Sequence, residues 1–107
     1  MGALLTVEVK QVAILVVRGE IDMAGLGDLQ GAIEPFLAPD QTVVLDLSEV
    51  TFADSTLLRV LTEAHGRITD VGGALLVRNP SDQARRLLTL GELDALVQDE
   101  TQRQNEA

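Results

Sequence analysis

The sequence predicts a single α/β domain, and three observations support this prediction. Residues 43–47 form a nearly continuous apolar run, the pattern of a strand buried on both faces. Apolar residues then recur at helical spacing over residues 57–68. After a pair of glycines at 72 and 73, which is a strong helix stop, residues 74–78 are again apolar. Strand, helix and strand at this spacing predict a βαβ unit with parallel strands and a right-handed crossover.

The first half of the chain adds a strand pair and a helix to this unit. Residues 5–10 alternate between apolar and polar, and residues 12–17 form a more apolar run. With a turn at Gln11, the two segments predict an antiparallel hairpin. Asp22 is then a candidate cap for a helix over residues 25–37. The proline near the end of that helix predicts that its last turn is bent or that it ends early.

The second half of the chain completes the predicted domain. The helix that follows residues 43–47 is expected to end near Val71, at the paired glycines. Residues 79–81 open a further helix, which Gly91 stops. Residues 93–97 predict a short edge strand.

Length and composition limit what this protein does. Its 107 residues suffice for one domain, placed at residues 3–98, followed by an acidic, flexible tail at residues 99–107. Eight basic against seventeen acidic residues give a net charge of -9, which repels nucleic acid and anionic lipid. The absence of cysteine excludes disulfides and thiolate zinc sites. Without a membrane-length apolar run or a secretory signal, a cytoplasmic protein that binds neither membranes nor nucleic acid is expected.

The candidate functional site is the tripeptide Asp54-Ser55-Thr56, between the central strand and its helix. All three residue types cap helices, so a capping role is one interpretation. The other is a serine displayed where backbone N–H groups and the helix dipole favour a bound or covalent anion. His65, the only histidine, lies more than two turns along the same helix, too far to serve Ser55 as a base. The sequence therefore predicts no enzyme, catalytic residue, metal or cofactor.

Three motifs occur in order along the chain. They are Gly-Glu-Ile-Asp at residues 19–22, the run Asp-Leu-Ser-Glu-Val-Thr-Phe-Ala-Asp-Ser-Thr at residues 46–56, and the glycines at 72 and 73 followed by Asn-Pro-Ser at residues 79–81. Together they resemble the STAS domain of the anti-sigma factor antagonists. The resemblance covers residues 4–97, which is nearly the whole chain.

This resemblance implies a mixed sheet of four or five strands with helices packed on one side. It implies that the unphosphorylated protein binds an anti-sigma factor, which is also a serine kinase of the histidine-kinase-like ATPase type. Binding frees a sigma factor and so regulates transcription, for example in a stress response. Phosphorylation of the serine after the motif aspartate, which is Ser55 here, releases the antagonist, and a metal-dependent serine phosphatase resets it.

The resemblance also implies a partner-binding surface. It is expected to contain Asp22, Asp54, Thr56, Leu57 and Arg59. Asp22 is similar to the family's acid beside the phosphorylation site, and Thr56 matches its second hydroxyl position. Leu57 and Arg59 stand where the family pattern has glycines, which would let a partner backbone approach closely. We hypothesise that Arg59, one helical turn after Ser55, pairs with phosphoserine and mutes its charge.

Two alternative functions remain open from the sequence. A non-switching STAS scaffold, such as the small subunit of a lipid-transport ATP-binding-cassette system, would bind its partner constitutively. A small hydrolase using Ser55 as its nucleophile is a further alternative, although it lacks a base. Asp22 and Asp54 as simple helix caps, and Thr56 as a first-turn residue, are compatible with each function. The sequence leaves the oligomeric state open.

Overall fold

The computed structural model describes residues 4–7 and 9–98 of the chain. The tail expected at residues 99–107 lies outside the described residues. The strands and helices, in chain order, are β1 (Gln11–Ile21), α1 (Leu26–Ile33), β2 (Gln41–Ala53), α2 (Thr56–Asp70), β3 (Ala74–Arg78), α3 (Asp82–Leu90) and β4 (Val97–Gln98). Short 3-10 turns lie at Met23–Gly25, Glu34–Phe36 and Asp94–Leu96.

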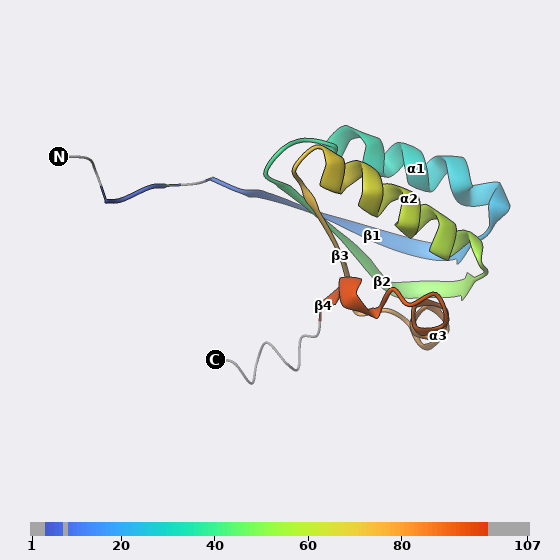
Figure 1. Cartoon of the computed structure of the whole chain (residues 1–107). Coiled ribbons are helices and arrows are strands. Elements are labelled where there is room, and N and C mark those ends of the chain that lie inside the picture. The colour runs from blue at the N-terminus through green and yellow to red at the C-terminus, as the bar shows by residue number, and fades with distance from the viewer. Residues whose placement is uncertain (1–3, 8, 99–107) are drawn as a thin grey trace.

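The four described strands form one sheet in the order β1-β2-β3-β4, and every neighbouring pair is parallel. A helix connects each strand to the next. Right-handed crossovers that always step in the same direction place their helices on the same face of the sheet. Figure 1 shows α1 and α2 side by side over the sheet. The predicted α/β class is confirmed, but the described strands form a parallel sheet rather than the mixed sheet that was expected.

The expected N-terminal hairpin is absent from the described residues. Residues 4–10 are here called the N-terminal arm. Its described residues, 4–7 and 9–10, run away from the body of the molecule, and none of them is in a strand (Figure 1). The chain joins the sheet only at Gln11, whose N–H donates to the carbonyl of Asp40 at 3.1 Å. A tight hairpin turn favours Gly, Asn or Asp, and Lys10 and Gln11 supply none of these. β1 is consequently an edge strand.

The central strand β2 is longer than the predicted residues 43–47. It continues to Ala53 because Val50 and Ala53 are buried while Ser48 and Glu49 face solvent. The pairing between β1 and β2 shifts register twice near this end, as a bulged strand does. The strand therefore delivers the chain to Asp54 and Ser55, immediately before the start of α2.

The predicted helices are present with adjusted ends. The helix expected over residues 25–37 is reduced to α1, and Pro35 lies in the 3-10 turn that follows it. Proline is tolerated there because the first positions of a helical turn need no N–H donor. The helix after β2 ends at Asp70, as predicted within one residue. The edge strand expected at residues 93–97 is a 3-10 turn followed by the two-residue β4.

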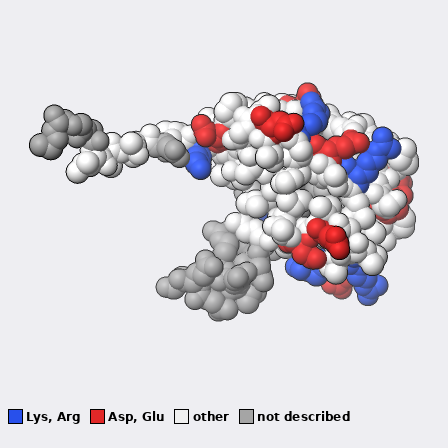
Figure 2. Space-filling view, viewed as in Figure 1, with Lys and Arg blue, Asp and Glu red and all other residues white. Residues whose placement is uncertain are grey.

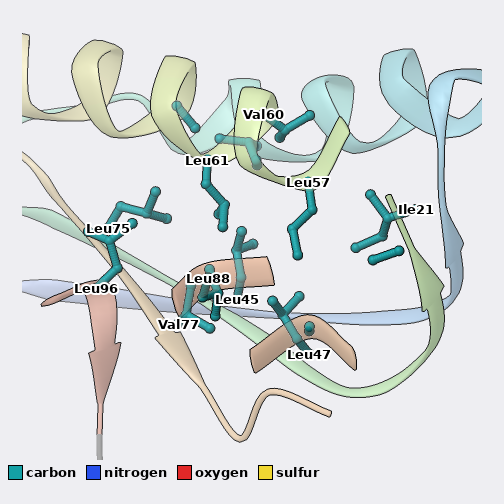
Figure 3. Packing of buried hydrophobic residues seen from close by; sticks show 14 of the residues in the cluster. Ile21, Leu45, Leu47, Leu57, Val60, Leu61, Leu75, Val77, Leu88 and Leu96 are labelled. Atoms are coloured by element: carbon teal, nitrogen blue, oxygen red, sulfur yellow. The ribbon is translucent and has the colours of Figure 1, made fainter. Parts of the chain in front are cut away.

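One aliphatic core fills the space between the sheet and the helices. Leu45 and Leu47 of β2 meet Leu57 and Leu61 of α2, and Leu88 of α3 joins them (Figure 3). All five side chains are fully buried. Full burial of such a side chain contributes about 1.5–3 kcal/mol. The core thus fixes the start of α2 firmly against the end of β2.

The opposite face of the sheet carries no helix and remains partly exposed. Side chains alternate between the two faces along a strand, so Leu15 and Val17 of β1 pack against the core. The alternate residues of β1 face away from it and are exposed. They are Val12, Ile14 and Val16, at 62%, 47% and 41%.

Candidate functional site

Ser55 lies at the junction between β2 and α2, with an exposed side chain. It occupies the cap position of α2, yet its backbone is helical (φ -60°, ψ -13°) and its side chain makes no capping hydrogen bond. The hydroxyl is thus exposed beside the N-terminus of a 15-residue helix, where negative charge is stabilised. This geometry favours the displayed-serine interpretation over the capping one.

Asp54 carries out the capping that Ser55 does not. Its carboxylate accepts the N–H of Thr56 at 2.8 Å. The hydroxyl and the N–H of Thr56 both favour the charged form of this carboxylate, which holds the pKa of Asp54 below its usual value. Asp54 is therefore a carboxylate at neutral pH, directly beside the Ser55 hydroxyl.

Asp22 is brought to the same edge of the sheet by the parallel pairing of β1 and β2. Ile21 and Ala53 are partners in the register, and the N–H of Asp54 donates to the carbonyl of Ile21 at 3.2 Å. Asp22 caps the following 3-10 turn by accepting the N–H of Gly25 at 3.2 Å. The capping interpretation holds for Asp22, which lies at the same strand ends as Asp54.

Two of the expected surface residues point inward instead. Leu57 is 0% exposed and packs in the core, so it is not available to a partner (Figure 3). Thr56 is 4% exposed, and its hydroxyl serves Asp54. The prediction that both contact a partner is corrected, because the first turn of α2 directs these side chains beneath the surface.

Arg59 is exposed on the same side of α2 as Ser55, and its N–H donates to the Ser55 carbonyl at 3.2 Å. Its guanidinium, however, pairs with Glu63, with Nε 3.3 Å from Oε1. Glu63 also accepts a hydrogen bond from Gln30 of α1 at 3.2 Å. A phosphate on Ser55 would therefore have to compete with Glu63 for Arg59.

Three residues near Ser55 were not singled out from the sequence. Gln83 of α3 donates through Nε2 to the carbonyl of Ala53 at 3.0 Å, which ties α3 to the end of β2. Met23 and Phe52, at the same two strand ends, are 62% and 42% exposed. Large exposed apolar side chains are typical anchors of protein interfaces. The sequence offered one signal for Phe52, which is one of only two aromatic residues in the chain.

The site offers acids, a hydroxyl and apolar side chains at the carboxyl ends of β1 and β2. Over residues 4–7 and 9–98, no group of three or more His, Cys, Asp or Glu is placed to hold a metal ion. His65 is exposed on α2, three turns along the helix from Ser55. In the same ranges, each helix is too short or too polar to reach across a lipid bilayer.

Comparisons with known proteins agree with the fold. A family model described as "Mlab, STAS domain" matches residues 5–98. Among solved structures, an anti-sigma factor antagonist from Mycobacterium paratuberculosis is 30% identical, with 85% of this chain and 78% of that chain covered and a TM-score of 0.66. No curated protein gives a significant sequence match.

Two further neighbours share the fold at lower identity. The unphosphorylated anti-sigma factor antagonist SpoIIAA, which Bacillus uses as a cell fate determinant and which is also known in a phosphorylated form, is 16% identical. That match covers 94% of this chain and 89% of that chain, with a TM-score of 0.74. The STAS domain of a SulP transporter from Vibrio cholerae is 18% identical, with 87% and 72% covered and a TM-score of 0.62.

Proposed function

Because the chain belongs to the STAS domain family, we propose that it is an anti-sigma factor antagonist that phosphorylation of Ser55 switches off. In its unphosphorylated form it binds an anti-sigma factor that is also a serine kinase, and so frees a sigma factor in the cytoplasm. A serine phosphatase restores the binding form. The protein needs no catalytic residue or cofactor of its own, and the response it serves includes stress-dependent transcription.

The observation that carries this proposal is the state of the Ser55 hydroxyl. It is exposed and makes no capping bond, because Asp54 caps the helix in its place. A kinase active site needs a hydroxyl that it can reach without unfolding the substrate. Ser55 meets that requirement at a junction held by the core on one side and by Gln83 on the other.

Electrostatics explain how the modification would break binding. Phosphorylation adds about 1.5 to 2 negative charges at neutral pH. Asp54 and Asp22 already make this edge of the sheet acidic. A partner surface that fits the unmodified site would therefore face an additional negative group that it does not pair. Such a group costs several kcal/mol in an interface, enough to change affinity by orders of magnitude. The domain itself need not change conformation.

The proposal is tested by phosphorylation with candidate anti-sigma kinases and Mg-ATP, followed by mapping of the phosphate by mass spectrometry. We expect one label, on Ser55, that is lost in Ser55→Ala. Ser48→Ala is the matched control, because Ser48 is also exposed but its hydroxyl donates to Asp46 at 2.7 Å. Label that persists in Ser55→Ala would contradict the proposed site. Calorimetry should show weaker kinase binding for Ser55→Asp than for Ser55→Ala.

A non-switching scaffold is the second candidate. It is favoured by Leu57 and Arg59 at the family's glycine positions and by STAS domains that belong to transporters among the structural neighbours. Such a subunit would bind its partner constitutively, as in a lipid-transport system. Co-purification with a transporter subunit, unchanged in Ser55→Asp and without label from any kinase, would select this function. A slow ester hydrolysis lost in Ser55→Ala would instead support the hydrolase.

A further inference from the structure

The free edge of β1 lies beside a groove whose lining is partly apolar and partly charged. β1 is the outermost strand at one side of the described sheet, so one of its edges has no neighbouring strand. The Gln11 N–H points toward β2. Because successive residues of a strand direct their N–H and C=O groups to opposite sides, those of Val12, Ile14 and Val16 point toward the free edge. A groove between this edge and α1 is lined in part by Leu15, Val17, Leu29 and Ala32.

The N-terminal arm has the alternating sequence pattern of a strand, with apolar residues at positions 5, 7 and 9. Leu5, Val7 and Val9 are 77%, 80% and 79% exposed. Figure 2 shows the described part of the arm as a mostly uncharged projection, whereas acidic and basic side chains lie close together on the body. Proteins rarely leave an apolar strand and an unpaired sheet edge both exposed, because each recruits strands from other chains.

Local geometry opposes pairing of the arm with β1 of the same chain. A two-residue loop at Lys10-Gln11 requires positive φ, which favours Gly, Asn or Asp. It would also pair Val7 with Ile14, on the face without helices, and leave the groove to polar arm residues. A three-residue loop would place its left-handed residue at Val12, where a β-branched side chain is strained. These two short return paths are both unfavourable for this sequence.

We infer that two copies of this chain exchange their N-terminal arms, each arm pairing antiparallel with the β1 edge of the other copy. With the two-fold axis at Gln11, Leu5, Val7 and Val9 lie opposite residues 17, 15 and 13 of the second copy. Directly opposed residues share a face of the sheet, so the three apolar arm side chains enter the groove beside α1. Such an isologous contact closes after two copies.

The lengths of the two segments support this register. Arm residues 5–10 cover residues 12–17 of the second copy. The regular pairing of β1 ends at that point, because its register against β2 shifts between Val16 and Arg18. Ser55 follows the opposite end of the sheet, so the exchanged arms do not cover it. The dimer is therefore independent of the proposed phosphoswitch, and each is tested without the other.

Sedimentation equilibrium across the micromolar range tests the exchange. We expect twice the mass of the chain for the native sequence, and a single-chain mass for Val7→Lys, which puts a charge in the groove. Thr6→Lys is the matched control: it adds the same charge on the other face and should stay dimeric. Circular dichroism checks that each variant is folded. A native chain that sediments as a monomer, or a dimeric Val7→Lys, would overturn the inference.

A turn variant separates exchange from any other dimer. Lys10→Asn with Gln11→Gly supplies the residues of a type I′ turn, so each arm gains a return path to its own chain, although Val7 then lies on the face without helices. The fraction of monomer should therefore rise. Lys10→Ala with Gln11→Ala removes the same side chains without supplying the turn, and should remain dimeric. If the Asn-Gly variant has no larger monomer fraction than the Ala-Ala variant, the arms are not what joins the copies.

Cross-linking locates the two-fold axis. The chain has no cysteine, so introduced thiols report without background. Gln11→Cys places two thiols opposite each other in the exchanged dimer, and mild oxidation should link the copies. Thr6 is also exposed, but the two thiols of Thr6→Cys lie at opposite ends of the paired strands and should stay unlinked. Equal cross-linking of the two variants would exclude this register.

Discussion

Ser55 differs from the other two serines of the chain in what its hydroxyl does. The hydroxyl of Ser48 donates to Asp46 at 2.7 Å, and that of Ser81 caps α3 by accepting the N–H of Ala84 at 3.4 Å. Ser55 makes no capping bond and is exposed. The sequence could indicate that residues 54–56 start a helix, but not which side chain caps it, because Asp, Ser and Thr all cap well.

Arg59 and Glu63 are expected to set how strongly phosphorylation acts. Arg59→Ala removes the cation nearest in sequence to the phosphate, so phosphorylation should weaken kinase binding further, by about twofold or more. Glu63→Gln releases Arg59 from its present ion pair, so phosphorylation should weaken binding less than in the native protein. The measurement is the ratio of Kd with and without phosphate, by calorimetry. An unchanged ratio in both variants would reject the pairing of Arg59 with phosphoserine.

Leu57 and Arg59 occupy the two family glycine positions but are expected to respond very differently to glycine. Leu57→Gly empties a fully buried site and should lower the free energy of unfolding by about 3–5 kcal/mol. Arg59→Gly changes only an exposed helical residue and should lower it by about 1 kcal/mol. Urea denaturation measures both. Similar small losses would contradict the burial of Leu57.

The contrast at Leu57 also shows what the sequence could predict of the site. Helical spacing correctly placed Leu57 with the inward-facing residues, whereas motif position placed it at the partner surface. Core packing determines where the Leu57 side chain lies, because a side chain that is 0% exposed cannot also contact a partner. Gln83 could not be found from the sequence, since its bond to Ala53 joins residues thirty positions apart.

At the scale of elements, the β2–α2–β3 unit was the best predicted part of the fold. Its strands are parallel, and its helix ends within one residue of the expected position, because apolar spacing and paired glycines act locally. The N-terminal arm was mispredicted because alternation of apolar and polar residues indicates a strand but does not indicate which other strand it pairs with. The end of β2 was missed because its exposed Ser48 and Glu49 resemble a turn.

The turn between α2 and β3 is expected to tolerate no side chain at Gly73. A Cβ there would lie 2.7 Å from the carbonyl oxygen of Gln41 and 3.2 Å from that of Ala38, both rigid backbone atoms. Gly73→Ala should therefore destabilise the domain by about 1–3 kcal/mol. Gly66→Ala, inside α2, is the control: its Cβ would meet no atom of another part of the molecule within 4 Å, and it should stabilise the domain by up to about 1 kcal/mol. Thermal unfolding gives both values, and the same sign for both would refute the steric argument.

At the scale of the whole molecule, parallel pairing determines where the candidate site lies. The carboxyl ends of β1 and β2 meet at one edge, which brings Asp22 beside Asp54 although they are far apart in sequence. Composition and motifs correctly predicted the class of the fold. They could not predict which apolar residues stay exposed, because exposure depends on the final packing of all the elements.

The stability of the whole domain is expected to fall in acid partly through Asp46. Burial raises the pKa of Asp46, but hydrogen bonds from Ser48 and from the Arg78 guanidinium outweigh it and hold the pKa below its usual value. Because the folded pKa is depressed, the stabilisation is present above the unfolded pKa and is lost as pH falls through the folded pKa. Asp46→Asn should thus destabilise the protein by about 1–3 kcal/mol near neutral pH.

Urea unfolding at about pH 7 and about pH 3 measures this effect. The difference in unfolding free energy between the two pH values should be smaller in Asp46→Asn than in the native protein. Asp70→Asn is the control, because it makes the same charge change on the exposed end of α2. An equal loss of stability in acid for Asp46→Asn and the native protein would show that the interactions of Asp46 with Ser48 and Arg78 do not contribute to the pH dependence of stability.

The half-exposed Phe52 at the end of β2 gives this domain an optical use. The chain contains neither tryptophan nor tyrosine, so its intrinsic ultraviolet emission is almost nil. Phe52→Trp would introduce a single fluorophore three residues from Ser55, on a side chain that solvent reaches. Any change in the colour or intensity of its emission would then report directly on what approaches that end of the sheet.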